Sequence, residues 1–284
     1  MNDGPPRIFD PAALALRRAR AQRIGGDTFL LREAEEGLAE RLAAVNRRFA
    51  HGLALNGLPG TGSALRAFAG HWIDAQFGPA ENLAVDAQST DLAVSLLTLH
   101  ALNDLPGALL QICRALKPDG LFLGALFGGE TLHELRDAFA TAEIETTGGI
   151  SPRVAPFGDV RDLGGLLQRA GFALPVADVE RTVVLYRDFS MLARDLRAHG
   201  ETNALTERRR KPLSRATLAT MLAHYRARHA EPDGRLRATF DIVYLTGWSP
   251  HESQQKPLQP GSAKSRLADA LGTDEKPAGE KTGR

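Results

Sequence analysis

Three glycines that lie close together are the first feature of the sequence with chemical meaning. Gly57, Gly60 and Gly62 follow the short apolar segment 51–56 and precede residues 63–69, which have the pattern of a helix start. A strand, a glycine-rich turn and a helix open a nucleotide-binding βα unit, in which glycine lets the backbone approach the ligand. The sequence therefore predicts a nucleotide-type ligand at this turn, although such a turn is by itself also typical of an ordinary tight connection.

His100 is the second residue whose position suggests chemistry. It follows the apolar run 91–99, which is predicted to be a buried strand. Ligands of open α/β sheets bind outside the carboxyl ends of the strands, so this histidine is placed to contact a substrate or to accept a proton near neutral pH. A histidine stacked at the edge of the core fits the same pattern, and both interpretations stay open. Asn103 and Asp104 predict the cap of the next helix rather than a catalytic element.

The other reactive side chains argue against several classes of site. No His and carboxylate cluster has metal-ligand spacing, so no metal is expected, and no Ser, His and Asp set can be argued. The single cysteine, Cys113, lies among apolar residues at helical spacing, which favours core packing and a reducing compartment. The basic run 208–211 stands in a chain whose formal charge is only +1, so it indicates solvated surface and no nucleic acid partner.

Strand-like and helix-like patterns alternate along most of the chain. Apolar runs of strand length are separated by amphipathic segments that begin with capping residues and end at glycine or proline. This alternation predicts an α/β fold with a doubly wound, mostly parallel sheet covered by helices on both faces. The expected strands are 51–56, 71–77, 91–99, 121–127, 178–186 and 239–248, and the expected helices are 9–23, 28–49, 63–69, 107–116, 131–146, 162–170, 188–199 and 214–228.

Composition divides the chain into three parts. Residues 1–50 form a helical lead-in, and residues 51–248 hold the α/β domain. Residues 249–284 are rich in Pro, Gly, Gln, Lys and Ser and predict a disordered tail. No apolar run approaches the ~20 residues of a membrane span, and the N-terminus has no secretory pattern. A cytoplasmic protein without membrane insertion is therefore expected.

Several segments in fixed order resemble a known family. Together they span roughly residues 8 to 250 and resemble the methyltransferase-like assembly factors of respiratory complex I, which are similar in turn to the methyltransferase of early biotin synthesis. The resemblance implies the class I methyltransferase fold, with a seven-stranded type of sheet, and S-adenosylmethionine as the cofactor. The segments that carry it are 8–10, 96–106, 116–125, 127–132, 151–153, 162–172, 200–203 and 244–248.

The resemblance assigns the glycine turn to the methionine half of the cofactor. Gly60 and Gly62 keep the family pattern, whereas Asn56 replaces an acidic residue and Leu58 stands where the first glycine is expected. Leucine resists positive φ, and Pro59 removes a backbone donor, so the usual turn must be reshaped. The change to an amide also removes a charge-assisted hydrogen bond. Weaker cofactor binding is expected.

The resemblance also implies a carboxylate after the second strand for the ribose and a polar group after the third strand for the adenine. Asp74 is the candidate for the ribose, with Gln76 in competition, and Asp86 is the candidate for the adenine edge. Only about twenty residues between Gly70 and Asp91 supply two strands and a helix, whereas a full βαβ unit takes about 30. Part of the central unit is therefore predicted to be missing, and each carboxylate has an ordinary surface role as its alternative.

Two functions follow from these expectations. The first is methyl transfer from S-adenosylmethionine to a small-molecule or protein acceptor, with His100 in the catalytic site and catalysis mainly by positioning. The second is a catalytically silent or altered, arginine-hydroxylase-like assembly factor whose partner is a respiratory-complex subunit. Methyl transfer is the leading expectation, and the altered glycine turn and the shortened unit support the second.

Overall fold

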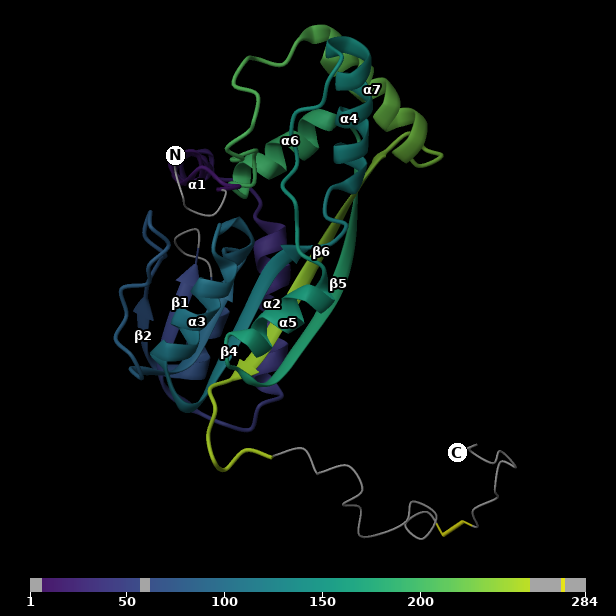
Figure 1. Cartoon of the computed structure of the whole chain (residues 1–284). Coiled ribbons are helices and arrows are strands. Elements are labelled where there is room, and N and C mark those ends of the chain that lie inside the picture. Colours follow the sequence, from purple (N-terminus) through teal and green to yellow (C-terminus); the bar gives the residue numbers. More distant parts are fainter. Residues whose placement is uncertain (1–6, 57–61, 256–271, 274–284) are drawn as a thin grey trace, which may run out of the picture. The chain divides into compact units, whose positions relative to one another are not determined.

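The computed structural model describes residues 7–56, 62–255 and 272–273 (Figure 1). The chain separates into two units, Met1–Pro250 and His251–Arg284. In the second unit, the described residues include a short turn in which the backbone N–H of His251 donates to Gln254 Oε1 at 3.2 Å. Most of the predicted tail lies outside the described residues, although Ser249, its first residue, is buried in the first unit.

The described strands form one mixed sheet in the order β2-β1-β3-β4-β6-β5. The first four of these are mutually parallel, and β6 runs antiparallel to both of its neighbours. The predicted α/β fold with a mostly parallel sheet is therefore confirmed, with an antiparallel addition at one side. The strands are β1 Phe49–Asn56, β2 Ala69–Asp74, β3 Thr90–Leu96, β4 Leu116–Gly128, β5 Ala173–Tyr186 and β6 Leu236–Trp248.

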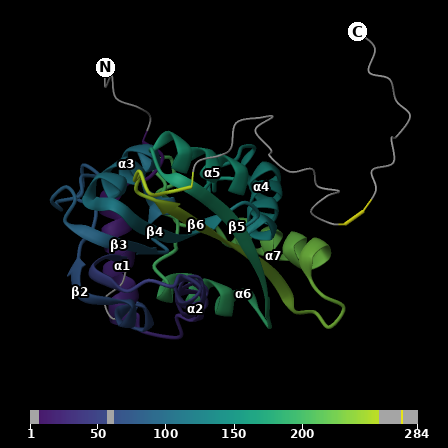
Figure 2. The ribbon, with the colours of Figure 1, turned by 90° about the horizontal axis from the view of Figure 1, so that it is seen from below.

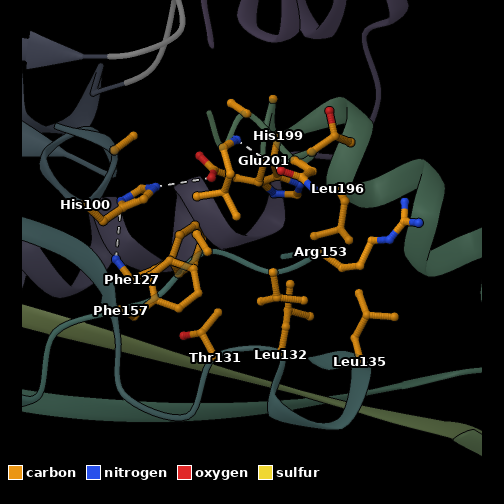
Figure 3. A pocket seen from close by; sticks show the side chains of 18 of the residues that line it. His100, Phe127, Thr131, Leu132, Leu135, Arg153, Phe157, Leu196, His199 and Glu201 are labelled. Atoms are coloured by element: carbon orange, nitrogen blue, oxygen red, sulfur yellow. Dashed lines mark hydrogen bonds and ion pairs between the residues drawn. The ribbon is translucent and has the colours of Figure 1, made fainter. Parts of the chain in front are cut away.

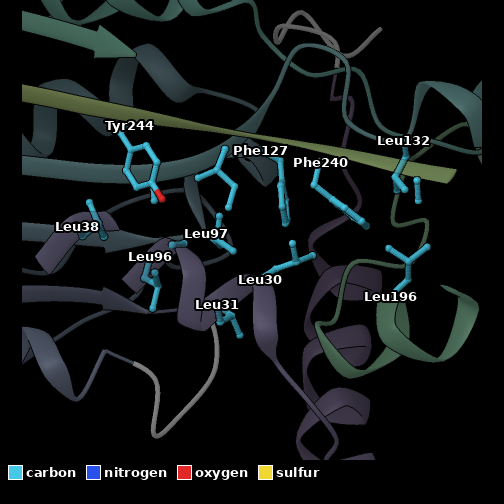
Figure 4. Close-up of a cluster of buried hydrophobic side chains, with 14 of the residues drawn as sticks. Leu30, Leu31, Leu38, Leu96, Leu97, Phe127, Leu132, Leu196, Phe240 and Tyr244 are labelled. Carbon is cyan, nitrogen blue, oxygen red and sulfur yellow. The ribbon is translucent and has the colours of Figure 1, made fainter. Parts of the chain in front are cut away.

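Helices cover both faces of this sheet (Figure 2). Alternate side chains of β3 point to opposite faces, so Leu92 and Val94 pack with α2 while Ala93 packs with α3 and α5. On the first face, Leu30 and Leu38 of α2 lie against Phe127 and Tyr244 of the sheet (Figure 4). The helices are α1 Pro11–Ile24, α2 Phe29–Ala43, α3 Leu105–Ala115, α4 His133–Thr147, α5 Val160–Arg169, α6 Phe189–Ala198 and α7 Arg215–His229, with 3-10 turns η1 Ala64–Phe68 and η2 Leu99–Ala101.

Three helix starts follow directly from capping residues in the sequence. The Asp10 carboxylate accepts from the backbone N–H groups of α1, and the Asp104 carboxylate accepts from Gly107 N at 2.8 Å. The Ser214 hydroxyl accepts from Thr217 N at 3.0 Å at the start of α7. These contacts confirm the predicted caps, including the capping role of Asp104.

The central unit is shortened as predicted. Residues 75–89 connect β2 to β3 without a helix or strand, and the helix expected over 63–69 is only the five-residue turn η1. A parallel crossover needs a dozen or more residues, usually as an α-helix, and the stretch 57–68 between β1 and β2 has only this minimum length. In the part of the chain that the structure describes, the sheet has six strands, one fewer than the seven-stranded type that the resemblance implies.

Candidate functional site

Two adjoining cavities lie at the carboxyl ends of the parallel strands. The large cavity, of about 630 Å³, is bounded by the ends of β1, β2 and β3 and by α1. The small cavity, of about 200 Å³, is bounded by the end of β4, the start of α4, α6 and the segment 199–205. Phe9, Leu14 and Ala101 line both cavities and form their shared wall. Ligands of open α/β sheets bind at this edge, so the pair of cavities is the candidate site.

The large cavity has apolar walls with a few polar groups. Leu55 and Thr98 mark the ends of β1 and β3, and Gln76 lies two residues past the end of β2. The Thr98 hydroxyl lies 3.3 Å from the carbonyl oxygen of Leu55, which joins the two strand ends. Arg18 reaches the same wall from α1, where burial lowers the pKa of its guanidinium although the charge of Glu201 opposes this effect.

Asn103 holds the N-terminal segment beside both cavities. Its Oδ1 accepts from Phe9 N at 2.8 Å, and its Nδ2 donates to the carbonyl of Phe9 at 3.2 Å and to Glu81 Oε1 at 2.8 Å. Next to it, Asp10 N donates to the carbonyl of Ala204 at 2.9 Å, and Phe9 forms an antiparallel bridge with Leu205. Phe9 and Asp10 are thus fixed between the loop after β3 and the segment after α6.

His100 and Glu201 meet in the wall of the small cavity (Figure 3). His100 Nε2 lies 3.2 Å from Glu201 Oε2, and its Nδ1 accepts from the backbone N–H of Phe127 at 3.5 Å. With Nδ1 accepting, Nε2 carries the hydrogen and donates a hydrogen bond to the carboxylate. The imidazole also packs edge-on against Phe127 and Phe157. His100 therefore stands at the predicted edge of the sheet, with both ring nitrogens engaged and its side chain 3% exposed.

Glu201 is placed by the end of α6. Gly200 adopts φ +78°, a conformation that glycine takes without strain, and Glu201 N then donates to the carbonyl of Leu196 at 2.8 Å. Burial alone would raise the pKa of the Glu201 carboxyl, but the electrostatic interaction and hydrogen bond with His100, together with the charge of Arg18, outweigh it and hold that pKa below its usual range. The group is therefore a carboxylate at neutral pH.

Arg153 lines the small cavity and is tied to a buried partner. Its Nε donates to Glu143 Oε1 at 2.8 Å, and its Nη2 forms a second, shorter bond to the same oxygen. Ser151 donates to Glu143 through its backbone N–H at 2.6 Å and through its hydroxyl at 2.8 Å. The Glu143 side chain is 1% exposed, so this ion pair fixes the segment 151–153 at the cavity.

The glycine turn is only partly described. Gly60 lies outside the described residues, and Asn56 ends β1, where its backbone pairs with Leu96. Gly62 is buried with φ +78° and donates its backbone N–H to Glu35 Oε2 at 2.9 Å. Glu35 Oε1 accepts from Ala64 N at 2.5 Å, so a carboxylate of α2 caps η1. Cofactor contacts at this turn stay a prediction.

The other predicted cofactor residues lie in different places. Asp74 ends β2 beside the site, but its carboxylate is exposed and paired with Arg66, and it is absent from the walls of the two cavities. Gln76, the competing candidate, lines the large cavity. Asp86 lies close to the end of α3, because Ser89 bonds to it and Ser89 N donates to the carbonyl of Ala115. That is the amino edge of β3, so the structure does not bring Asp86 to the cavities.

Three functional candidates were missed by sequence reasoning. Glu201 lies in the segment 200–203, one of those that carry the family resemblance, so this signal could have indicated it. Arg18 is one of several arginines in α1, and nothing local separates it from its neighbours. Glu35 lies in the helix expected over 28–49, part of the helical lead-in, and its contact with Gly62 depends on the tertiary fold.

No three His, Cys, Asp or Glu side chains in residues 7–56, 62–255 and 272–273 are grouped so that they could hold a metal ion. Over the same ranges, no helix combines the length and the apolar character that crossing a membrane requires.

Comparisons with known proteins agree with this fold. A family model described as a methyltransferase domain matches residues 42–124. The human protein named arginine-hydroxylase NDUFAF5, mitochondrial, is 46% identical over 64% of this chain and 53% of its own length. Its Dictyostelium discoideum counterpart is 44% identical over 66% of this chain and 43% of its own length. The matches thus span about half the length of these relatives.

A second group of relatives carries a different name. The malonyl-[acyl-carrier protein] O-methyltransferase of Laribacter hongkongensis is 39% identical over 64% of this chain and 58% of its own length. The solved structure of the YcgJ protein from Bacillus subtilis, 12% identical, covers 76% of this chain and 99% of that chain with a TM-score of 0.50, which is a likeness of fold. The chain therefore carries a class I methyltransferase domain related to both the NDUFAF5 and the malonyl-[acyl-carrier protein] O-methyltransferase proteins.

Proposed function

We propose that the chain transfers a methyl group from S-adenosylmethionine, held in the large cavity, to an acceptor held in the small cavity. The observation that carries this proposal is the shared wall of Phe9, Leu14 and Ala101 between two cavities at the carboxyl edge of the sheet. Group transfer requires two ligands with their reacting atoms close together, and adjoining cavities meet this requirement.

The residues of the large cavity fit such a cofactor. Its volume lies in the range of roughly 300–1,000 Å³ that is usual for small-molecule sites. Gln76 brings a polar amide side chain of the kind that ribose and adenine contact, and Arg18 brings a positive charge for a carboxylate. Leu55 and Ala101 supply apolar contacts.

Positioning by the chain is the main source of catalysis in this proposal. When bound, S-adenosylmethionine supplies an electrophilic methyl group on its sulfonium sulfur. Asn103 and the Phe9 backbone hold the shared wall in place, and the aromatic side chains Phe127 and Phe157 exclude water from the small cavity. His100 orients the carboxylate of Glu201 toward the acceptor. Holding both reactants in this way can account for up to about 7–11 kcal/mol of the barrier.

Calorimetric titration with S-adenosylmethionine tests the proposal. We expect saturable binding with one site per chain, which Ala101→Trp weakens because the indole fills the shared wall. Leu110→Trp, at an exposed position of α3 away from both cavities, is the matched control and leaves the affinity unchanged. Absence of heat at millimolar ligand contradicts the proposal.

A second function is favoured by the names of the relatives. Proteins named arginine-hydroxylase NDUFAF5 match this chain at 44–46% identity, compared with 39% for the Laribacter O-methyltransferase. Under this alternative the chain is an altered relative that acts on, or assembles with, a respiratory-complex subunit. A chain that binds no S-adenosylmethionine but binds such a subunit in the same assay buffer supports the alternative over methyl transfer.

A further inference from the structure

The carboxylate of Glu201 is an unusual group for a cavity with mostly apolar walls. Much of the cavity wall is apolar and includes Leu132, Leu135, Phe139 and Phe157. The side chain of Glu201 is 22% exposed. One oxygen, Oε2, bonds to His100. In the described part of the chain no hydrogen bond to Oε1 is found. A carboxylate in apolar surroundings needs partners for its lone pairs, and here one oxygen is left for a ligand.

The remaining charges at the small cavity are already engaged or point elsewhere. Arg153 lies across the cavity from His100, and it directs two of its nitrogens to Glu143 (Figure 3). Arg197 also lines the wall but is exposed, and an arginine in such a position usually packs its stem on the wall and keeps its charged end in water. His199 donates through Nδ1 to the carbonyl of Asp195 at 2.8 Å and accepts at Nε2 from Leu30 N.

Arg18 and Glu201 place opposite charges at the two cavities. Arg18 lines the large cavity and not the small one, whereas Glu201 lines the small cavity and not the large one. Their mutual attraction stabilises the carboxylate. The shared wall therefore has a positive group on its large-cavity side and a negative group on its small-cavity side.

We propose that Glu201 determines the specificity of the small cavity, by binding an acceptor that carries an ammonium group on an apolar chain and rejecting one that carries a carboxylate. That this ligand is a methyl acceptor rests on the proposed function. The charge preference of the small cavity does not, because binding of the ligand needs no cofactor. An ammonium donates to the unoccupied Oε1, and its apolar chain packs on the Leu and Phe side chains of the wall. A carboxylate in the same place faces like charge in a site with little water.

A matched pair of small probes of opposite charge tests this proposal. The affinities of n-pentylamine and pentanoate are measured by calorimetry at pH 7 on the full chain without cofactor. We expect the amine to bind at least ~10-fold more tightly, which corresponds to about 1.4 kcal/mol. Glu201→Gln brings the ratio close to one, and Glu36→Gln, which removes an exposed carboxylate of α2, keeps the wild-type ratio.

Each other outcome overturns the proposal. Pentanoate binding as tightly as the amine, an unchanged ratio in Glu201→Gln, or no binding of either probe at about 20 mM contradicts it. If Glu201→Gln does not fold, as judged by its thermal melting curve, the ratio for the wild-type chain still decides. Titration with S-adenosylmethionine is read separately, so an amine preference without cofactor binding rejects methyl transfer and retains the role of Glu201.

Discussion

Arg18, His100 and Glu201 come from three distant parts of the chain and meet at the wall between the two cavities. His100 is fixed by the backbone of Phe127 and in turn orients the Glu201 carboxylate. Arg18 supplies the opposing charge from the other side of the wall. The arrangement gives each cavity its own charged group, which agrees with the proposal of one cavity for a cofactor and the other for an acceptor.

The contact to the cofactor ribose can be tested at two neighbouring positions. Gln76 lines the large cavity, whereas the exposed carboxylate of Asp74 is paired with Arg66. We expect Gln76→Ala to weaken the binding of S-adenosylmethionine about 10-fold, the equivalent of roughly 1.4 kcal/mol. Asp74→Ala serves as the matched control and changes the affinity less. The opposite order of effects assigns the ribose to Asp74, as the family resemblance implies.

The buried pair of Glu143 and Arg153 predicts a dependence of stability on pH. Burial raises the pKa of the Glu143 carboxyl, but hydrogen bonds from Ser151 and the charge of Arg153 outweigh this and lower it overall. The stabilisation is therefore complete above the unfolded-state pKa of about 4.3 and is lost as the pH falls through the lower folded-state pKa.

Glu143→Gln measures the contribution of this pair. Removing one partner of a buried pair is expected to cost on the order of 3 kcal/mol in the free energy of unfolding at pH 7, and less at pH 3. Urea unfolding at both pH values gives the two differences. Equal losses at pH 7 and pH 3 contradict an ionised Glu143 in the folded chain.

The sequence predicts the position of some residues of the site and not of others. It predicts that His100 lies at the sheet edge because His100 directly follows a long apolar run, which is a local feature of the sequence. The Glu201 contact spans 101 positions along the chain, and the pattern of neighbouring residues contains no trace of such a pairing. Asp86 lies at the amino edge of β3, because the described connection 75–89 contains no strand that would carry it to the carboxyl side.

Among the elements, α2 is fixed to the sheet by a close approach at Gly37. A Cβ atom at this position would lie 2.2 Å from the hydroxyl oxygen of Tyr244. The tyrosine has little freedom to move, because the Arg41 guanidinium covers its ring at 3.6 Å and Arg41 is held by Asp178 and Glu180. The helix can sit at this distance only with glycine.

Two glycine substitutions within helices separate this packing effect from helix propensity. Alanine is the better helix former by up to about 1 kcal/mol, so Gly165→Ala in α5, where a Cβ meets no atom within 4 Å, is expected to stabilise the chain. Gly37→Ala is expected to destabilise it by about 1–3 kcal/mol through overpacking. Thermal melting measures both, and stabilisation by both changes contradicts the packing that we describe.

Most elements were predictable from periodicity and capping residues. The strands and helices fall close to their expected ranges because the continuous apolar runs of β3 and β4 and the caps at Asp10, Asp104 and Ser214 are encoded locally. The reversed direction of β6 was not predictable, because strand direction depends on where the chain returns after α7. The helix expected at 63–69 shortened to η1, since its amphipathic pattern is too brief to show which helix type forms.

At the scale of the whole molecule, residues 9–24 form part of the walls of the site and do not only precede the α/β domain. Asn103 holds the Phe9 backbone at both its N–H and its carbonyl. We expect Asn103→Ala to raise amide hydrogen exchange over residues 8–24 while exchange in β3 and β4 stays slow. Asn46→Ala, at an exposed position after α2, is the control. Unchanged exchange over residues 8–24 contradicts this role for Asn103.

The most direct measurement of the central claim is a crystal structure of the chain with S-adenosylmethionine bound. The account predicts that the cofactor lies in the large cavity beside Gln76 and Arg18 and that its methyl group faces the shared wall of Phe9, Leu14 and Ala101. A cofactor bound elsewhere, or one whose methyl group points away from the small cavity, would contradict the assignment of the two cavities to donor and acceptor.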